Sequence, residues 1–197
     1  MTPTGPLNLA IIVGSTREGR FGPTVAAWFA EEAGRRPAFR LDLVDLAETA
    51  LPGVLAADDA EPSELPEPVR ALGERLDRAD AFVIVTPEYN RSFPASLKTA
   101  VDWYVDEWKA KPVGFVSYGG ISGGLRAVEH LRQVFAELHA VTVRNTVSFH
   151  SCWDRFDDHG RPIDAAGCRA AADSLLDQLT WWARTLRDAR AERPYAA

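Results

Sequence analysis

The sequence predicts an α/β fold, a doubly wound three-layer sandwich with a five-stranded parallel sheet and helices on both faces. Three observations predict it. Short apolar runs alternate with helical stripes along the chain, which is the order that parallel strands joined by crossover helices require. The length of 197 residues suits one domain. The composition, 46% hydrophobic and 25% charged, is typical of a globular protein with a packed core.

Five segments are predicted as strands. Leu7–Val13 is a continuous apolar run, as expected for a strand covered on both faces, and residues 39–43 alternate between apolar and polar. Further apolar runs predict strands over residues 81–86 and 112–117, and a fifth within residues 141–149. Their regular separation leaves room for a helix after each strand.

Apolar residues at spacings of three and four predict the helices. The first stripe runs from Val25 to Ala33, and a second helix is expected near residues 69–78. Three more stripes span residues 97–108, 125–138 and 172–186. Residues 52–68 contain four prolines and many acidic residues, so we expect an ordered loop there.

The loop after the first strand is the first candidate site, because ligands of such sheets bind at the carboxyl ends of the strands. Ser15, Arg17, Arg20, Phe21 and Gly22 lie between this strand and the next helix. Backbone amides at a helix start attract anions, and arginine matches the geometry of phosphate. Arg20 stands where a P-loop has its lysine, so this is not a P-loop. The alternative is a plain polar turn with a solvated arginine.

The loop after the third strand is stiffened by two prolines. Pro87, Glu88, Tyr89 and Asn90 open it, and a rigid backbone that carries an aromatic ring and an amide can lie against a planar ligand. A rigid connection with Tyr89 packed on the core is an equally open alternative.

The loop after the fourth strand contains four glycines in residues 119–124. Ser117, Gly119 and Gly120 begin it, and glycine lets a ligand approach the backbone closely. The same loop matches the G-x-S-x-G nucleophile motif, so a serine hydrolase using Ser122 with Asp154 and His159 is a competing hypothesis. Ser122 lies five residues beyond Ser117, however, whereas a nucleophile of that kind follows its strand directly.

Trp103 lies off the apolar stripe of the predicted helix over residues 97–108. It covers a ligand or meets a partner subunit in one interpretation, and is a semi-buried residue at the helix edge in the other. We predict no metal site, because the spacings between the cysteines and histidines near residues 150–168 match no zinc pattern.

The charge balance argues against two classes of partner. The formal net charge of −6 disfavours nucleic acid and anionic membrane surfaces, since both need clustered positive charge. The longest apolar run is too short to span a bilayer, and residues 1–8 carry no Lys or Arg of a secretory signal. We therefore expect a cytoplasmic protein with no nucleic-acid or membrane partner.

Taken together, three motifs resemble the NADPH-dependent FMN reductase family. They are Gly14-Ser15-Thr16-Arg17-x-x-Arg20-x-Gly22-Pro23, Pro87-Glu88-Tyr89-Asn90 and Ser117-Tyr118-Gly119-Gly120. The likeness runs in order over roughly residues 7–190. The family comprises flavodoxin-like proteins that include quinone, chromate and azo-dye reductases. The resemblance implies one flavodoxin-like FMN-binding domain over residues 1–197, with its core at about 7–190.

The resemblance also implies which residues hold FMN without a covalent bond. Around the phosphate it places Ser15, Arg17, Arg20, Phe21 and Gly22. Against the ring and the ribityl chain, largely through backbone groups, it places Pro87, Glu88, Tyr89 and Asn90. The other edge of the ring falls to Ser117, Gly119 and Gly120. Family members are dimers or tetramers, so we expect a homodimer or homotetramer, with Trp103 at the subunit contact or covering the flavin.

The implied function is that of an FMN-dependent NAD(P)H oxidoreductase. NADPH or NADH gives hydride to FMN, and a quinone or similar small electron acceptor takes it in a ping-pong cycle. No side chain is predicted to be catalytic, because the cofactor carries the chemistry. A non-enzymatic flavodoxin-type electron carrier and, less favoured, the hydrolase using Ser122 remain as alternatives.

Overall fold

A sheet of five parallel strands forms the centre of the protein, in a computed structural model that describes residues 5–57 and 60–196. The strands are β1 Leu7–Val13, β2 Phe39–Asp45, β3 Ala81–Pro87, β4 Pro112–Tyr118 and β5 Val141–Phe149. Their order across the sheet is β2-β1-β3-β4-β5, which is the flavodoxin-type order. The predicted parallel sheet is confirmed, and each strand ends within two residues of its predicted end.

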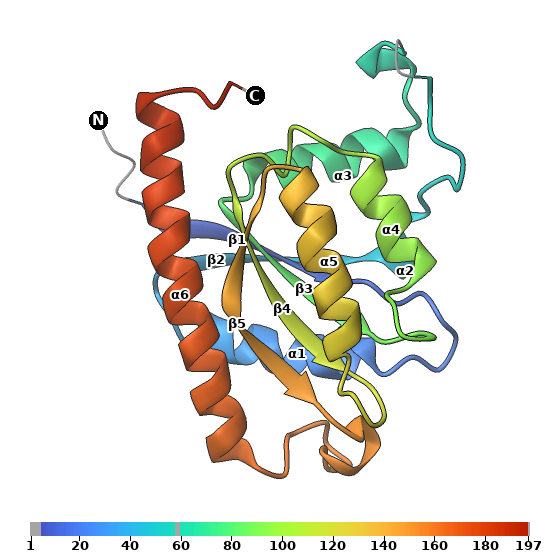
Figure 1. Cartoon of the computed structure of the whole chain (residues 1–197), viewed down its shortest axis with the longest axis vertical. Coiled ribbons are helices and arrows are strands. Elements are labelled where there is room, and N and C mark those ends of the chain that lie inside the picture. The colour runs from blue at the N-terminus through green and yellow to red at the C-terminus, as the bar shows by residue number, and fades with distance from the viewer. Residues whose placement is uncertain (1–4, 58–59, 197) are drawn as a thin grey trace.

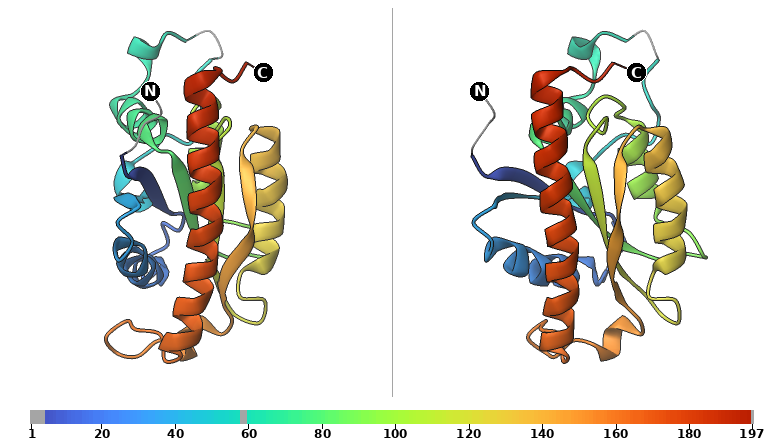
Figure 2. Two further views of the ribbon diagram at one scale, coloured as in Figure 1. Left: turned by 90° about the vertical axis from the view of Figure 1, so that its left-hand side faces the viewer. Right: turned by 60° about the vertical axis from the view of Figure 1, so that its left-hand side comes forward.

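Two layers of helices enclose the sheet (Figures 1 and 2). The helices are α1 Gly22–Gly34, α2 Leu46–Thr49, α3 Glu67–Arg78, α4 Ala95–Asp102, α5 Leu125–Glu137 and α6 Ala165–Glu192, with 3-10 turns η1 Pro62–Glu64 and η2 Cys152–Asp154. α1 and α6 pack on one face, and α3, α4 and α5 on the other. The three-layer flavodoxin-like fold is therefore confirmed.

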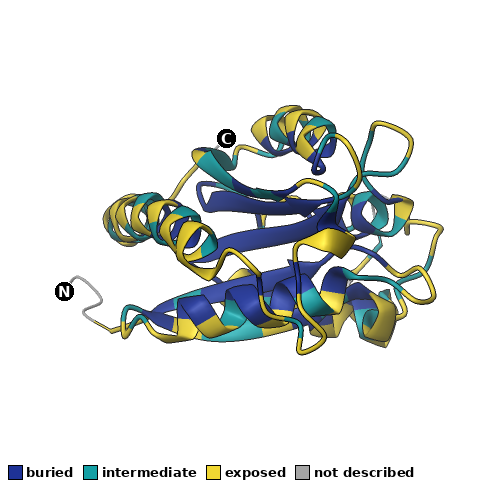
Figure 3. Cartoon of the chain, turned by 90° about the horizontal axis from the view of Figure 1, so that it is seen from below, coloured by how far each residue is buried: buried dark blue, intermediate teal, exposed yellow. Residues whose placement is uncertain are grey.

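The pleat of the strands divides the core into two clusters. In β1, Leu9, Ile11 and Val13 face α1 and α6, while Ala10 and Ile12 face the opposite helices. Successive side chains of a strand point to opposite faces, so the uninterrupted apolar residues Leu9–Val13 of β1 serve both layers. Figure 3 shows the strands buried between helices whose outer surfaces are exposed.

The predicted helix over residues 97–108 is wrong in its second half, because α4 ends at Asp102. Tyr104 and Trp108 are buried from a series of turns instead, and the Trp108 indole N–H donates to the Val101 carbonyl at 3.2 Å. Val105, which the helical stripe would bury, is 50% exposed. Apolar spacing alone does not distinguish a helix from turns that bury the same side chains.

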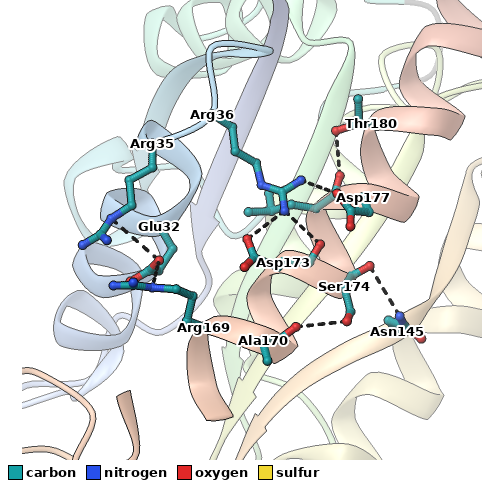
Figure 4. A network of polar contacts seen from close by, with 11 residues as sticks. Glu32, Arg35, Arg36, Asn145, Arg169, Ala170, Asp173, Ser174, Asp177 and Thr180 are labelled. Carbon is teal, nitrogen blue, oxygen red and sulfur yellow. Dashed lines mark hydrogen bonds and ion pairs between the residues drawn. The ribbon is translucent and has the colours of Figure 1, made fainter. Parts of the chain in front are cut away.

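Three ion pairs connect α1 and the turn after it to α6 (Figure 4). The Arg36 guanidinium contacts the carboxylates of Asp173 at 2.7 Å and Asp177 at 2.5 Å. Glu32, buried on α1, accepts from Arg169 at 3.2 Å. Partly exposed pairs contribute about 1 kcal/mol or less each, so they orient α6 while its buried apolar residues hold it.

Lys111 lies at the amino end of β4, opposite the edge that carries the candidate site, and is only 5% exposed. Its Nζ donates to the carbonyls of Leu76 and Asp77 at the end of α3, at 2.9 and 2.8 Å. Burial, helped by the charge of Arg190, lowers the pKa of Lys111 to about 8. The folded state therefore releases this proton at a lower pH than the unfolded chain does.

We predict that this proton makes the stability of the protein depend on pH. Between about pH 8 and 10.5 the unfolded chain holds the Lys111 proton and the folded chain does not, so the free energy of unfolding rises with pH. Relative to Lys111→Met, the wild-type protein should gain on the order of 1–3 kcal/mol across this window in urea unfolding. Lys98→Met, at an exposed lysine, should run parallel to wild type. A Lys111→Met curve that also parallels wild type would contradict the prediction.

Candidate functional site

The register of the sheet brings three loops to one edge. Val13 pairs with Val85 and Thr86 with Ser117, so the loops after β1, β3 and β4 begin side by side. A cavity of about 380 Å³ opens between them. It is lined by Ser15, Arg17, Glu18, Gly19, Arg20, Phe21, Pro87, Glu88, Tyr89, Tyr118, Gly119, Gly120, Cys152 and Trp153. Nine of the residues predicted from the sequence are in this lining.

The two arginines of the first loop differ in their contacts. Arg20 forms a two-point ion pair with Asp45 at 2.6 and 2.8 Å and also donates to the Ser15 carbonyl at 2.9 Å. The hydrogen bonds to Asp45 raise the pKa of Arg20. Arg17 is exposed, and its guanidinium has no hydrogen bond or ion pair within the described part of the chain. Arg20 therefore braces the loop, and Arg17 is the cation left for a ligand.

Helix α1 begins directly after the first loop, at Gly22. Phe21 occupies the N-cap position, so no side chain there accepts from the first amides of the helix. Uncapped amides and the helix dipole favour an anion at this place. Phe21 also contacts the ring of Phe156 edge-on, with ring centroids 5.2 Å apart, which fixes the wall of the cavity.

The second loop is a two-residue β-turn. Tyr89 and Ser92 exchange two backbone hydrogen bonds, of 2.8 and 3.0 Å, and the residues between them, Asn90 and Arg91, have φ of 49° and 70°. Positive φ at both central positions is the type I′ geometry, which asparagine tolerates well. The turn fixes Tyr89, whose hydroxyl lies 2.6 Å from the Ser15 hydroxyl of the first loop.

Glu88 joins the second loop to the third. Its carboxylate accepts from the Ser122 hydroxyl at 2.5 Å and from the backbone and side chain of Arg126 at 3.2 and 2.9 Å. Burial acts to raise the pKa of Glu88, but these hydrogen bonds outweigh it and hold the pKa below its usual value. Glu88 is thus an ionised brace between the two walls of the cavity.

These contacts answer the hydrolase hypothesis. The hydroxyl of Ser122 donates to Glu88. His159 lies in an exposed turn, where its backbone N–H donates to the Asp157 carboxylate. In the described residues no histidine ring is hydrogen-bonded to Ser122, so the general base that a nucleophilic serine requires is missing. The expected triad does not form.

A hydrogen bond from Ser117 holds the glycine loop against the end of β4. This buried residue donates its hydroxyl to the Gly123 carbonyl at 2.8 Å and does not line the cavity. Gly124 has φ of 84°, and a Cβ there would lie 2.7 Å from Cβ of Ser117. Only glycine therefore permits the loop to fold back over the strand end.

Tyr118 carries a buried polar atom that lacks a partner. The residue lines the cavity and is 4% exposed, and among the described residues its hydroxyl has no hydrogen-bond partner. Burial raises the pKa of Tyr118 well above its usual value and outweighs the nearby Ser15 hydroxyl, which acts to lower it, so the Tyr118 hydroxyl stays protonated. A Cβ on Gly22 would lie 2.8 Å from this oxygen. A buried hydroxyl without a partner costs about 1–3 kcal/mol, which a ligand with an acceptor atom would recover.

Four predicted residues lie outside the lining: Gly22, Asn90, Ser117 and Trp103. Gly22 lies behind Tyr118, and Asn90 and Ser117 support loops, as described above. Trp103 follows α4, packs partly buried on the core, and donates its indole N–H to the Pro52 carbonyl at 3.0 Å.

The sequence patterns assigned no site role to Asp45, Tyr118, Cys152 and Trp153, although Tyr118 stands in one of the three motifs. Asp45 ends β2 at the same edge, and Cys152 and Trp153 follow β5 there. Their positions after a strand were the available signal, since carboxyl ends of parallel strands share one edge.

Comparison with known proteins shows which family the chain belongs to. Residues 7–154 match the model of the family described as NADPH-dependent FMN reductase. An NAD(P)H-dependent FMN reductase of Schizosaccharomyces pombe is 39% identical over 122 residues, which are 59% of this chain and 60% of that one. A 2-hydroxy-1,4-benzoquinone reductase of Burkholderia sp. is 32% identical over 187 residues, 92% of this chain and 98% of that one.

A solved structure agrees with these matches. FerB, a flavoenzyme NAD(P)H:(acceptor) oxidoreductase from Paracoccus denitrificans, superposes with a TM-score of 0.71 at 26% identity, covering 88% of this chain and 97% of that one. Within residues 5–57 and 60–196, no helix is both long enough and apolar enough to cross a bilayer. The chain belongs to the NADPH-dependent FMN reductase family, and it is an oxidoreductase that works with FMN and NAD(P)H.

Proposed function

We propose that this enzyme transfers hydride from NADPH or NADH to a quinone or similar small acceptor through FMN held in the cavity at the ends of β1, β3 and β4. One observation supports the proposal most strongly: Tyr118 lines this cavity, and its buried hydroxyl has no hydrogen-bond partner among the described residues. Such an atom is expected where a ligand completes the hydrogen bonding. The relative named as a benzoquinone reductase supports the choice of acceptor.

The residues present fit an FMN molecule. Arg17 and the uncapped start of α1 suit its phosphate, since one offers a free guanidinium and the other backbone amides. A Cβ on Gly120 would meet nothing within 4 Å, so a ligand has room to approach the backbone there, although the carbonyls of Gly119 and Gly120 accept from Cys152 and Ser151. Tyr89 offers a half-buried phenol beside Ser15. The set of donors is that expected for a phosphate and a ring with carbonyl edges.

When bound, FMN supplies the redox chemistry, in which NAD(P)H, a proton and a quinone give NAD(P)⁺ and a hydroquinone. The chain contributes binding and orientation. Arg17 would bind the FMN phosphate. Arg20 donates to the Ser15 carbonyl and so holds the first loop in place. The Tyr118 hydroxyl stays protonated and able to donate. Glu88 is ionised and its oxygens are engaged by Ser122 and Arg126, so it positions the loops and does not deliver a proton.

The proposal has four further parts. Nicotinamide and acceptor use the same site in turn, which is a ping-pong cycle. The chain acts as a homodimer or homotetramer with Trp103 at or near the subunit contact, and it works in the cytoplasm. Residues 1–197 form one FMN-binding domain, since α6 packs on the sheet with α1.

Anaerobic spectroscopy tests the proposed reaction. The protein is loaded with FMN and mixed with NADPH or NADH, and the yellow colour of the bound FMN should bleach and then return when a quinone is added. Steady-state rates at several quinone concentrations should give parallel double-reciprocal lines. Bound FMN that neither nicotinamide bleaches would overturn the proposal, and intersecting lines would overturn its ping-pong part.

Arg17→Ala should weaken FMN binding at least about tenfold. Among the described residues, Arg17 is the only cationic side chain of the cavity lining without a protein partner, and this variant removes it. Fluorescence quenching during titration of the FMN-free protein measures the Kd. Added salt should weaken FMN binding to the wild-type protein more than binding to the variant, since salt screens the exposed charge of Arg17. Arg35→Ala, a half-exposed arginine on α1 outside the lining, is the control and should leave the Kd unchanged. An unchanged Kd in Arg17→Ala would mean that this loop does not bind the phosphate.

A further inference from the structure

We propose that Trp153 forms a wall of the acceptor site and stacks on the ring of a planar quinone. This specificity role rests on the proposed function. No sequence motif of the family resemblance includes Trp153, which follows β5 rather than the three motif-bearing strands.

Backbone hydrogen bonds place Trp153 at the cavity. Ser151 N donates to the Gly120 carbonyl at 2.9 Å, and Cys152 N donates to the Gly119 carbonyl at 3.0 Å. The short turn η2 is therefore attached to the glycine loop that forms one cavity wall. The backbone of Ser151, with φ of 47°, turns the chain so that Cys152 is buried while the next residue lines the opening.

The indole is exposed although its base is fixed. Trp153 is 68% exposed, whereas Cys152 before it and Phe156 after it are both buried in the core. An anchored turn with a free aromatic ring leaves apolar surface in water that a planar ligand can cover. Aromatic rings stack favourably on one another beyond the effect of buried area. A quinone is planar and uncharged, so it needs this kind of contact rather than a charge.

A second exposed apolar side chain lies in the glycine loop that is bonded to η2. Ile121, in the glycine loop bonded to η2, is 88% exposed. The chain as a whole carries a net charge of −6. Trp153 lines the cavity and Ile121 lies in the loop bonded to η2, and exposed apolar side chains on these two segments favour a neutral ring as the occupant over a second anion.

Binding without turnover tests the role. Oxidised, FMN-loaded protein is titrated calorimetrically with 2-methyl-1,4-naphthoquinone in the absence of NAD(P)H. Trp153→Ala should raise the Kd about fivefold to tenfold, and Trp153→Phe, which keeps an aromatic ring, should recover most of the affinity. In steady-state assays the KM for the same quinone should rise by a similar factor.

Trp181 provides the matched control. It is 60% exposed on α6, contacts Trp182 with ring centroids 4.9 Å apart, and lies outside the cavity lining. Trp181→Ala should leave the quinone Kd and KM unchanged, whereas an equal loss in both variants would overturn the inference as a general effect of removing an exposed tryptophan.

The remaining outcomes separate the two proposals. If wild type binds and reduces the quinone and Trp153→Ala does so equally well, the inference fails and the proposed function stands. If Trp153→Ala changes the oligomeric state in sedimentation velocity, Trp153 belongs to a subunit contact and the inference is overturned. Wild-type protein that binds FMN but no quinone overturns both.

Discussion

The parallel register of β1, β3 and β4 is the constraint on which the site depends. Because these strands run the same way and end level with one another, three loops that are far apart in the sequence open at one edge. Two ion pairs hold these loops in place, since Arg20 of the first loop is bound to Asp45 and Glu88 of the second loop to Arg126. The cavity lies between these three loops, whose positions follow from the strand register and the two ion pairs.

This arrangement separates charges that support the site from those left for a ligand. Arg20 and Glu88 each have a partner of opposite charge, so neither adds net charge to the cavity. Arg17 has none among the described residues, and it stands beside the positive end of α1. A chain of net charge −6 thus presents a small cationic position next to the hydroxyls of Ser15 and Tyr89 and the exposed indole of Trp153. Under the proposed function, these three features bind the FMN phosphate, the polar edge of the ring and the planar acceptor.

The pattern of the sequence predicted the sheet, the positions of its strands and the edge that carries the site. Apolar runs and the rule for parallel sheets are sufficient for that. The direction of individual side chains was not predictable, because Arg20 turns to Asp45 and Ser117 turns beneath the glycine loop for reasons of tertiary contact. The helix predicted to reach residue 108 ends at residue 102, since turns bury the same apolar residues. Trp153 follows β5, whereas the three sequence motifs follow β1, β3 and β4, so no motif pointed to it.

A crystal structure of the chain grown with FMN would show directly whether the flavin binds in this cavity. We expect flavin density inside the cavity, with the phosphate beside Arg17 and the start of α1, and with an acceptor atom of the ligand or an ordered water bonded to the Tyr118 hydroxyl. Flavin density at another place on the chain, with this cavity filled only by solvent, would contradict it.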